Sequence, residues 1–127
     1  MTEMFTPSTL SYLETQRLGR LATVRPDGTP QNNPVGFRYN AELGTIDIAG
    51  HNMGASRKFR NLAGNPHVSF VVDDIASVQP WRVRCVEIRG TAQALREVET
   101  YLPGGSGELI RITPERVLAF GIDSPAP

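Results

Sequence analysis

The sequence has a single cysteine, Cys85, and that residue lies in no cysteine–histidine spacing typical of a metal site. An internal disulfide is therefore impossible, and we expect no bound metal and a reducing compartment. Neither sign of charge is in excess, because 13 basic residues balance 13 acidic ones. This balance disfavours non-specific binding to nucleic acid or to acidic membranes. No apolar run is long enough to cross a bilayer, and residues 1–7 lack a signal-peptide pattern, so we expect a soluble cytoplasmic protein.

The length of 127 residues suits one domain with a hydrophobic core and is too short for two, so we expect a single domain over 1–127. Twelve glycines and ten prolines indicate many turns, which are typical of a strand-rich fold. The clearest turn is Pro26 to Pro30, where a proline presets φ and Gly28 accepts the positive φ of a bulged hairpin.

Alternation of apolar and polar residues predicts strands over 20–25, 31–39, 45–49, 67–72, 81–94, 108–112 and 116–122. Pro34 removes a ladder hydrogen bond, which places its strand at a sheet edge or makes it irregular. We expect a helix from Thr6-Pro7 to Leu18-Gly19, a second beginning near Ser56, and one or two helical turns over 96–102. Residues 73–80 are expected to form an irregular connection, and 113–115 a turn. Hairpin-linked strands with few helices predict a mainly β fold, a small antiparallel barrel.

Two strands carry apolar residues on both faces. In 81–94 the apolar face switches after Cys85, which indicates either a bulge or burial on both faces. In 116–122, Val117 and Ala119 face one way while Leu118, Phe120 and Ile122 face the other. A terminal strand with two apolar faces predicts that a second subunit covers one of them.

The segment from Gly50 to Pro66 is the strongest candidate for a site. Ser56 is a good N-cap residue, and Arg57, Lys58 and Arg60 follow it in the first turn of the helix. Basic residues there oppose the helix dipole, so a bound phosphate or carboxylate would account for them. The alternative is an ordinary surface helix with solvated basic residues, and spacing alone does not separate the two interpretations.

The chain resembles the pyridoxamine 5'-phosphate oxidase-like split β-barrel family, and within it the actinobacterial branch of coenzyme F-420-dependent oxidoreductases. The segments that carry the resemblance are 18–24, 26–31, 34–40, 45–48, 55–60, 71–74, 80–84, 86–90 and 114–117. Together they cover nearly the whole chain, and their order and spacing are more specific than any one of them. The resemblance implies an FMN-binding type of split barrel with short helices.

The resemblance also implies a homodimer with two cofactor sites at the subunit interface. Ser56 and Lys58 match the positions that hold the cofactor phosphate, within a phosphate-binding segment from His51 to Lys58. The second strand would line the ring system of the cofactor, and Trp81 would reach the same pocket from the partner subunit. The cofactor-binding residues expected in this way are Asn32, Asn33, Pro34, Val35, His51, Ser56, Arg57, Lys58 and Trp81. His51 and Trp81 also have an ordinary structural interpretation, as a strand-end residue and a packing residue.

No catalytic triad, carboxylate pair or metal cluster is visible, so the catalytic residues stay unassigned. A flavin or deazaflavin would carry the hydride chemistry itself. The resemblance implies an oxidoreductase that uses reduced F-420 to transfer hydride to an electron-poor small molecule. The alternatives are an FMN-dependent oxidase or reductase of the same fold and a non-catalytic carrier of either cofactor.

Overall fold

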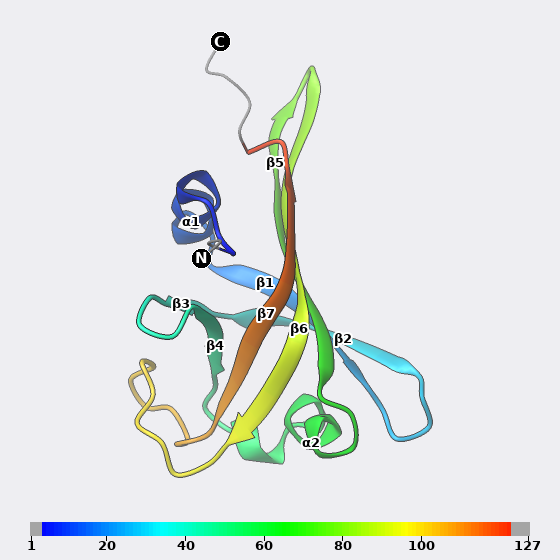
Figure 1. Cartoon of the computed structure of the whole chain (residues 1–127), viewed down its shortest axis with the longest axis vertical. Helices are drawn as coiled ribbons and strands as arrows, with labels where there is room; N and C mark the ends of the chain where they lie inside the picture. Colours follow the sequence, from blue (N-terminus) through cyan, green and yellow to red (C-terminus); the bar gives the residue numbers. More distant parts are fainter. Residues whose placement is uncertain (1–3, 123–127) are drawn as a thin grey trace.

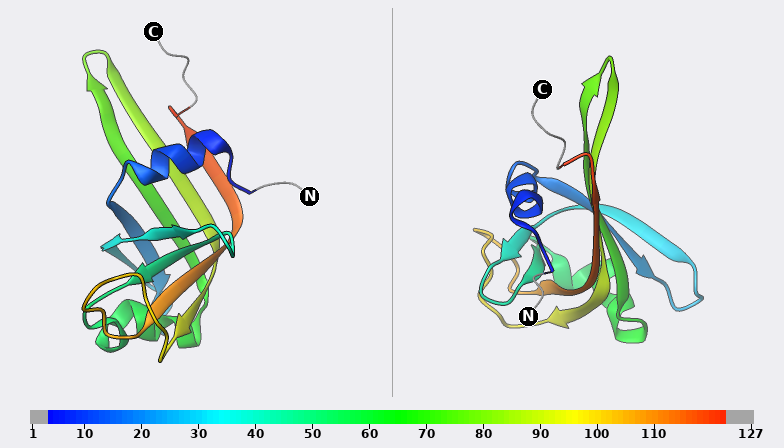
Figure 2. Two further views of the ribbon diagram at one scale, coloured as in Figure 1. Left: turned by 90° about the vertical axis from the view of Figure 1, so that its left-hand side faces the viewer. Right: turned by 45° about the horizontal axis from the view of Figure 1, so that its top comes forward.

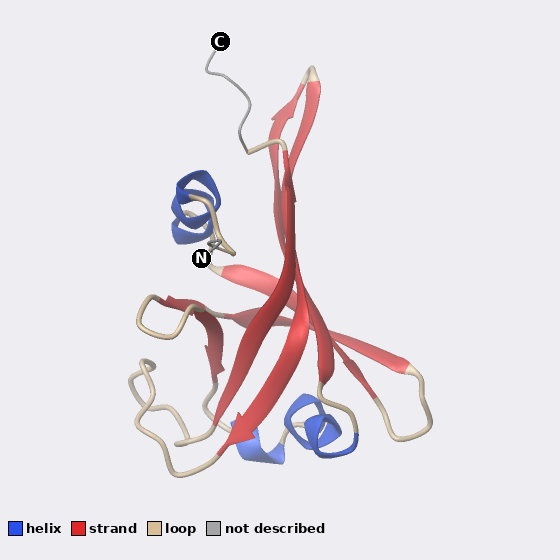
Figure 3. Ribbon diagram, viewed as in Figure 1, coloured by secondary structure: helices blue, strands red, loops and turns tan. Residues whose placement is uncertain are grey.

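The computed structural model describes residues 4–122, and Figure 1 shows one antiparallel sheet curled into a half-barrel. The strands are β1 (Leu18–Val24), β2 (Pro30–Gly36), β3 (Arg38–Asn40), β4 (Thr45–Ala49), β5 (His67–Val78), β6 (Trp81–Leu95) and β7 (Leu109–Phe120). The helices are α1 (Pro7–Glu14), the 3-10 turn η1 (Met53–Ala55) and α2 (Arg57–Gly64). Figure 3 shows strands predominating over helices. The prediction of a small, mainly β antiparallel barrel with short helices is confirmed.

The strand order β2-β1-β5-β6-β7-β4-β3 explains the curl of the sheet. Strands β2 and β3 lie at opposite edges, yet only Phe37 separates them in the chain. The two edges must therefore come close together, which bends the sheet around its own core. The predicted single strand 31–39 is thus two strands broken at Phe37. Pro34 lies on the edge strand β2, as its missing N–H predicts.

The core lies inside the curled sheet, and strands β5 and β6 supply its centre. Val72 pairs with Val86 and Phe70 with Ile88, and all four side chains are fully buried. Burial of such side chains stabilises the fold by about 1.5–3 kcal/mol each. Gly19 is required on the neighbouring strand, because a Cβ there would lie 2.3 Å from the ring of Phe70.

Both helices begin as predicted, and side chains hold them to the sheet. Thr6 caps α1 by accepting a hydrogen bond from the backbone N–H of Thr9 at 3.1 Å. The hydroxyl of Tyr12 then donates to Asp74 at 2.8 Å, which fastens α1 to the long β5–β6 hairpin. Helix α1 ends at Glu14, earlier than predicted, because residues from Leu18 onward pair with β2.

The β5–β6 hairpin is longer than the sequence predicts. Residues 73–78 continue β5 and pair with the start of β6, where an irregular connection was expected. Figure 1 shows this part of the hairpin projecting beyond the barrel, so neither face enters the core and the alternating pattern disappears. Pairing is continuous from Val72–Val86 to Asp73–Cys85, so the switch of apolar face after Cys85 is not a bulge. It marks the point at which β6 enters the barrel.

Two other predictions along the C-terminal part are wrong. Residues 96–102 form no helix, and they belong to a loop between β6 and β7. The expected turn at 113–115 lies within the continuous strand β7, which shifts register against β6 between Arg89 and Gly90. Pro114 is paired with Gly90 on β6. A Cβ added to Gly90 would lie 2.1 Å from the carbonyl oxygen of Thr113, so only glycine fits at position 90. The proline therefore marks a bulge, a signal that resembles a turn in sequence.

Within residues 4–122, no helix is long and apolar enough to cross a membrane. The same residues contain no group of three or more acidic, cysteine or histidine side chains that could hold a metal ion.

Candidate functional site

A pocket of about 260 Å³ lies where the ends of β2 and β4 approach η1 and α2. Its walls are Pro34, Val35, Gly36, Ala49, Gly50, His51, Asn52, Met53 and Lys58. Predicted residues from three separate segments, Pro34 and Val35, His51, and Lys58, therefore meet at one place. Among these wall residues, Lys58 supplies the only strongly basic group.

Lys58 is half-buried, and burial lowers the pKa of its ammonium group. The lowered pKa means that the charged form has lost water without gaining a compensating charge. Within residues 4–122 no carboxylate lies within 4.0 Å of its nitrogen. A partly buried cation without an acidic partner at the wall of a pocket is well suited to a bound anion.

Ser56 supports this lysine from within the chain. Its Oγ accepts a hydrogen bond from the backbone N–H of Phe59 at 3.4 Å and donates to the carbonyl of Met53 at 2.6 Å. It therefore caps α2 and joins the helix to η1, and it is not among the residues that line the pocket. The hydroxyl proton is already used by Met53, so direct donation from Ser56 to a phosphate would require that bond to break. Its role as a phosphate ligand stays a prediction.

Helix α2 is fixed at its other end by Asn61. The buried amide of Asn61 donates to Thr23 Oγ1 at 3.0 Å and to Gln31 Oε1 at 3.3 Å. These bonds tie α2 to strands β1 and β2, whose far end forms the opposite wall of the pocket. The distance from Lys58 to that wall is therefore set by the fold.

The turn from Gly50 to Gly54 is held by the loop between β6 and β7. The backbone N–H of Ser106 donates to the Gly50 carbonyl at 2.9 Å, while its Oγ accepts from the Met53 N–H at 3.0 Å. Glu108 Oε1 accepts a hydrogen bond from the backbone N–H of Gly54 at 3.1 Å. His51 is exposed, and its Nδ1 lies 3.1 Å from the carbonyl oxygen of Gly104. The sequence predicts a flexible loop over 103–107 but not its contact with this turn, because a Gly- and Ser-rich stretch gives no signal of where it folds back.

A second hollow, of about 650 Å³, adjoins the Lys58 pocket and shares Gly36, Ala49, Gly50 and His51 with it. Arg17 and Tyr101 are among its other wall residues. Together the two hollows offer more room than the Lys58 pocket alone, in the size range of small-molecule sites.

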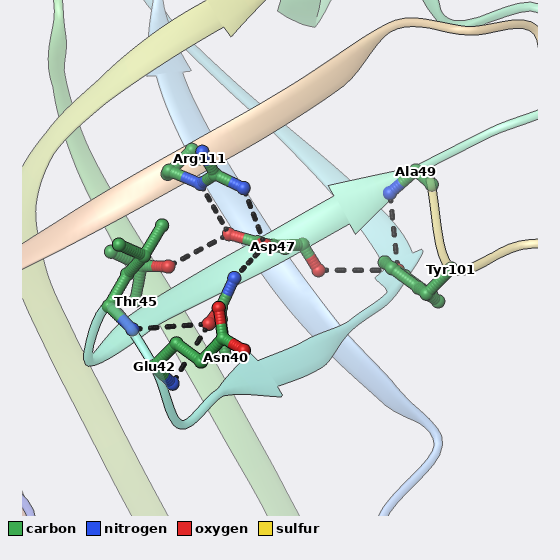
Figure 4. Close-up of polar contacts among 8 residues, drawn as sticks. Asn40, Glu42, Thr45, Asp47, Ala49, Tyr101 and Arg111 are labelled. Atoms are coloured by element: carbon green, nitrogen blue, oxygen red, sulfur yellow. Dashed lines mark hydrogen bonds and ion pairs between the residues drawn. The ribbon is translucent and has the colours of Figure 1, made fainter. Parts of the chain in front are cut away.

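Beneath this hollow lies a fully paired polar cluster, drawn in Figure 4. Asp47, 1% exposed, accepts hydrogen bonds from Arg111 at 3.1 Å, from Thr45 at 2.9 Å and from Asn40 at 3.0 Å. Burial by itself would raise the pKa of Asp47, but these hydrogen bonds outweigh it and hold the pKa below its usual value. The cluster joins β4 to β7 and fixes the end of β4 that forms the pocket.

Tyr101 connects the cluster to the hollow. Its hydroxyl accepts from the Ala49 N–H at 3.1 Å and donates to the Asp47 carbonyl at 3.2 Å, as Figure 4 shows. Burial raises the pKa of the phenol above its ordinary value. No local pattern singles out this tyrosine, since its partners lie more than fifty residues away.

The remaining predicted residues lie outside the pocket. Asn32 is exposed, and Asn33 accepts a hydrogen bond from Gln31 at 2.8 Å without lining the pocket. Arg57 is exposed. Trp81 is 64% exposed at the tip of the β5–β6 hairpin, which projects away from the barrel in both views of Figure 2. Within its own chain, Trp81 is therefore not part of this site.

Comparison with known proteins gives a consistent result. A family model described as pyridoxamine 5'-phosphate oxidase matches residues 5–120. A 5a,11a-dehydrotetracycline/5a,11a-dehydrooxytetracycline reductase of Streptomyces rimosus is 50% identical over 123 residues, which cover 94% of this chain and 84% of that protein.

Solved structures share the fold. A protein described as an F420 reductase is 27% identical with a TM-score of 0.65, over 85% of this chain and 94% of that one. The conserved hypothetical protein Rv2991 of Mycobacterium tuberculosis is 20% identical with a TM-score of 0.71, over 97% of this chain and 89% of that one. The second likeness shows the fold alone.

Proposed function

This chain belongs to the pyridoxamine 5'-phosphate oxidase family, and we propose that it is a reductase that uses reduced coenzyme F-420 to reduce a conjugated, electron-poor small molecule. Its 50% identity to a reductase supports the general class of oxidoreductase. The choice of F-420 over FMN draws on the likeness to an F420 reductase. The structural observation that carries the proposal is Lys58, a half-buried cation without an acidic partner in the described chain, at the wall of a pocket.

The residues around the pocket fit a cofactor with a phosphate and a flat ring system. Lys58 would hold the phosphate, because a charge-assisted contact would compensate for the water that its ammonium group has lost. Pro34 and Val35 on the edge strand would lie against the ring system. When bound, a reduced deazaflavin supplies a hydride.

The chain itself would contribute binding, orientation and exclusion of water. Asn61 holds the edge strand through Gln31, and Ser106 holds the turn at Gly50, so the pocket would keep its shape without a ligand. A preformed site loses little conformational entropy on binding. The larger hollow next to the pocket leaves room for a second small molecule, the substrate.

For the substrate we propose a fused-ring compound with a carbon–carbon double bond conjugated to a carbonyl, of the kind named for the Streptomyces relative. Such a double bond would accept hydride at the carbon remote from the carbonyl, and the resulting enolate would take a proton from water to complete the reduction. An FMN-dependent reductase of the same fold is the second candidate, since Lys58 serves the phosphate of either cofactor.

We also propose that the enzyme is a homodimer. Four large apolar side chains of the hairpin and of the end of β7 are exposed: Ile75 at 54%, Val78 at 73%, Trp81 at 64% and Phe120 at 60%. A partner subunit would cover them, and Trp81 would then approach the partner's cofactor pocket. A stable interface of this kind buries about 2,000 Å² or more. Sedimentation at micromolar concentration tests this proposal, and a monomer would contradict it.

The function is tested with the purified full-length chain, reduced F-420 and 5a,11a-dehydrotetracycline. We expect oxidation of F-420 coupled to loss of the substrate double bond, measured by absorbance and mass spectrometry. If the purified protein is yellow because it retains FMN, and if it does not oxidise reduced F-420, the FMN alternative is favoured. Tight cofactor binding without turnover on a panel of conjugated ketones would indicate a carrier.

A further inference from the structure

A third hollow, the α1–β3 cleft, lies between helix α1 and strand β3, which are on the same side of the barrel in Figures 1 and 2. Its volume is about 460 Å³, and Leu10, Leu13, Phe37 and Tyr39 form its apolar walls. This volume lies within the roughly 300–1,000 Å³ typical of small-molecule sites. No step of the function proposed above uses this cleft.

The aromatic wall of the cleft is rigid. The ring of Phe37 packs edge-on against Phe70 at 5.3 Å, and the ring of Tyr39 packs edge-on against Phe5 at 5.2 Å. Both supporting rings are buried in the core. The two wall rings are therefore fixed before any ligand arrives, which reduces the entropy lost on binding.

The cleft adjoins the larger hollow, which in turn adjoins the Lys58 pocket. It shares Glu14, Gln16 and Phe37 with the 650 Å³ hollow, and that hollow shares Gly36 and Gly50 with the Lys58 pocket. The three hollows therefore follow one another from Lys58 to α1, and a substrate held in the cleft would lie close to the pocket that would hold the cofactor.

The guanidinium group of Arg38 lies between the cleft and the 650 Å³ hollow. Arg38 lines the cleft, and its guanidinium lies 5.1 Å from the ring centre of Tyr101, which lines the hollow. Within residues 4–122 Arg38 forms no ion pair. Its charge is therefore available to an acidic oxygen of a bound molecule.

We propose that the α1–β3 cleft binds the fused-ring body of the substrate, a polycyclic ketone, with its acidic enol or phenol oxygens toward Arg38. This inference rests on the proposed function for the identity of the substrate. The apolar rings would lie against Leu10 and the fixed rings of Phe37 and Tyr39. The cleft would then select substrates by size, while the Lys58 pocket selects the cofactor.

The test is Leu10→Trp, which fills the cleft from α1. The Kd for tetracycline, measured from the anisotropy of tetracycline fluorescence, should increase by about tenfold or more. The KM for 5a,11a-dehydrotetracycline should rise in parallel, while turnover of the one-ring ketone 2-cyclohexenone and the Kd for F-420 stay unchanged. Ser11→Trp is the matched control, because Ser11 lies on the same helix but lines a different hollow.

Wild-type affinity for tetracycline in Leu10→Trp would overturn the proposal. So would a change from dimer to monomer in that variant, because the cleft would then be a contact between two copies. Ala41→Trp fills the cleft from the β3–β4 turn and repeats the test if Leu10→Trp does not fold. If wild type binds tetracycline at the cleft but oxidises no F-420, the proposed function fails and the cleft assignment stands.

Discussion

Two buried or half-buried charged side chains, Asp47 on β4 and Lys58 on α2, differ in whether the protein supplies them with partners. Asp47 is almost fully buried, and Arg111, Asn40 and Thr45 all donate hydrogen bonds to it. Lys58 is half-buried with no acidic partner among residues 4–122. Removing a charge from water costs several kcal/mol unless partners replace the water. At Asp47, hydrogen bonds from the protein offset the free energy of desolvation. We infer that a bound ligand offsets it at Lys58.

The pKa values show the same contrast. Burial by itself would raise the pKa of Asp47, but the hydrogen bonds from Arg111, Asn40 and Thr45 outweigh it and lower the pKa, so the charged form is stabilised in the folded protein. Burial lowers the pKa of Lys58 as well, but for a base this means that its charged form is destabilised. The shift at Asp47 is that of a charge whose partners are all within the protein. The shift at Lys58 is that of a charge without such partners, which a bound anion would stabilise.

The largest effect is expected when the paired charge is broken. Arg111→Ala leaves Asp47 charged and buried without its main partner, so the free energy of unfolding should fall by about 3–5 kcal/mol. Urea unfolding followed by circular dichroism measures this change. Arg89→Ala, which removes an exposed ion pair with Glu87, is the control and should have a small effect. Equal effects of the two variants would mean that the Asp47 cluster is not a supporting element.

The unpaired charge should behave in the opposite way. Lys58→Met keeps the aliphatic stem and removes the desolvated charge, so the ligand-free protein should be as stable as wild type or slightly more stable. Its Kd for F-420 should increase about tenfold or more, because a charge-assisted contact to the phosphate is lost. Fluorescence titration and urea unfolding are measured on the same preparations.

Arg57→Met is the matched control for Lys58→Met. It removes a neighbouring exposed cation of the same helix, and we expect a much smaller change in the Kd for F-420. If Lys58→Met instead lowered the free energy of unfolding and left the Kd for F-420 unchanged, Lys58 would be a structural residue and not a ligand-binding one.

The dependence of the unfolding free energy on acid pH tests the role of Asp47 separately. The folded pKa of Asp47 lies below its ordinary value of about 3.9. Its contribution to stability is therefore complete above that value and is lost as the pH falls through it toward the folded pKa. We expect Asp47→Asn to flatten the fall of unfolding free energy between about pH 5 and pH 3. The remaining slope should come from the other carboxyl groups whose pKa is lowered, which are Asp74, Asp27, Glu87 and Glu108.

The sequence alone predicts Lys58 and the edge strand because their signals are local. A serine cap, basic residues in a first helical turn and a proline within a strand can all be recognised within a few residues. The turn at Gly28 follows from the same kind of local chemistry, and φ there is +89°. The resemblance to the family, and not these local features, placed Pro34, Val35 and His51 in one expected site with Lys58, and the structure brings all four to one pocket.

The framework of the site could not be predicted in this way. Asp47 finds Arg111 across β4 and β7, and Tyr101 reaches back to the same strand from a loop without regular structure. Such contacts depend on register and on sheet order, which no local pattern encodes. The same reason explains why 73–78 was misread, since that part of β5 leaves the core and loses its alternation.

The smallest expected effect concerns the exposed cations beside the unpaired lysine, and it distinguishes F-420 from FMN. Arg57 and Arg60 lie on α2 and are exposed, so they add little to the fold. F-420 carries an acidic tail beyond its phosphate and FMN does not, so only F-420 gives these residues a partner. Exposed charges are screened over about 8–10 Å at ordinary ionic strength. Raising the salt from low to moderate concentration should therefore weaken F-420 binding by about twofold to fivefold more than FMN binding. Arg60→Gln should reduce that difference, while Arg25→Gln, a change in the β1–β2 turn outside α2, should leave it unchanged. Tighter binding of FMN than of F-420, or an identical salt response of the two cofactors, would contradict the F-420 assignment and leave Lys58 as a phosphate site for FMN.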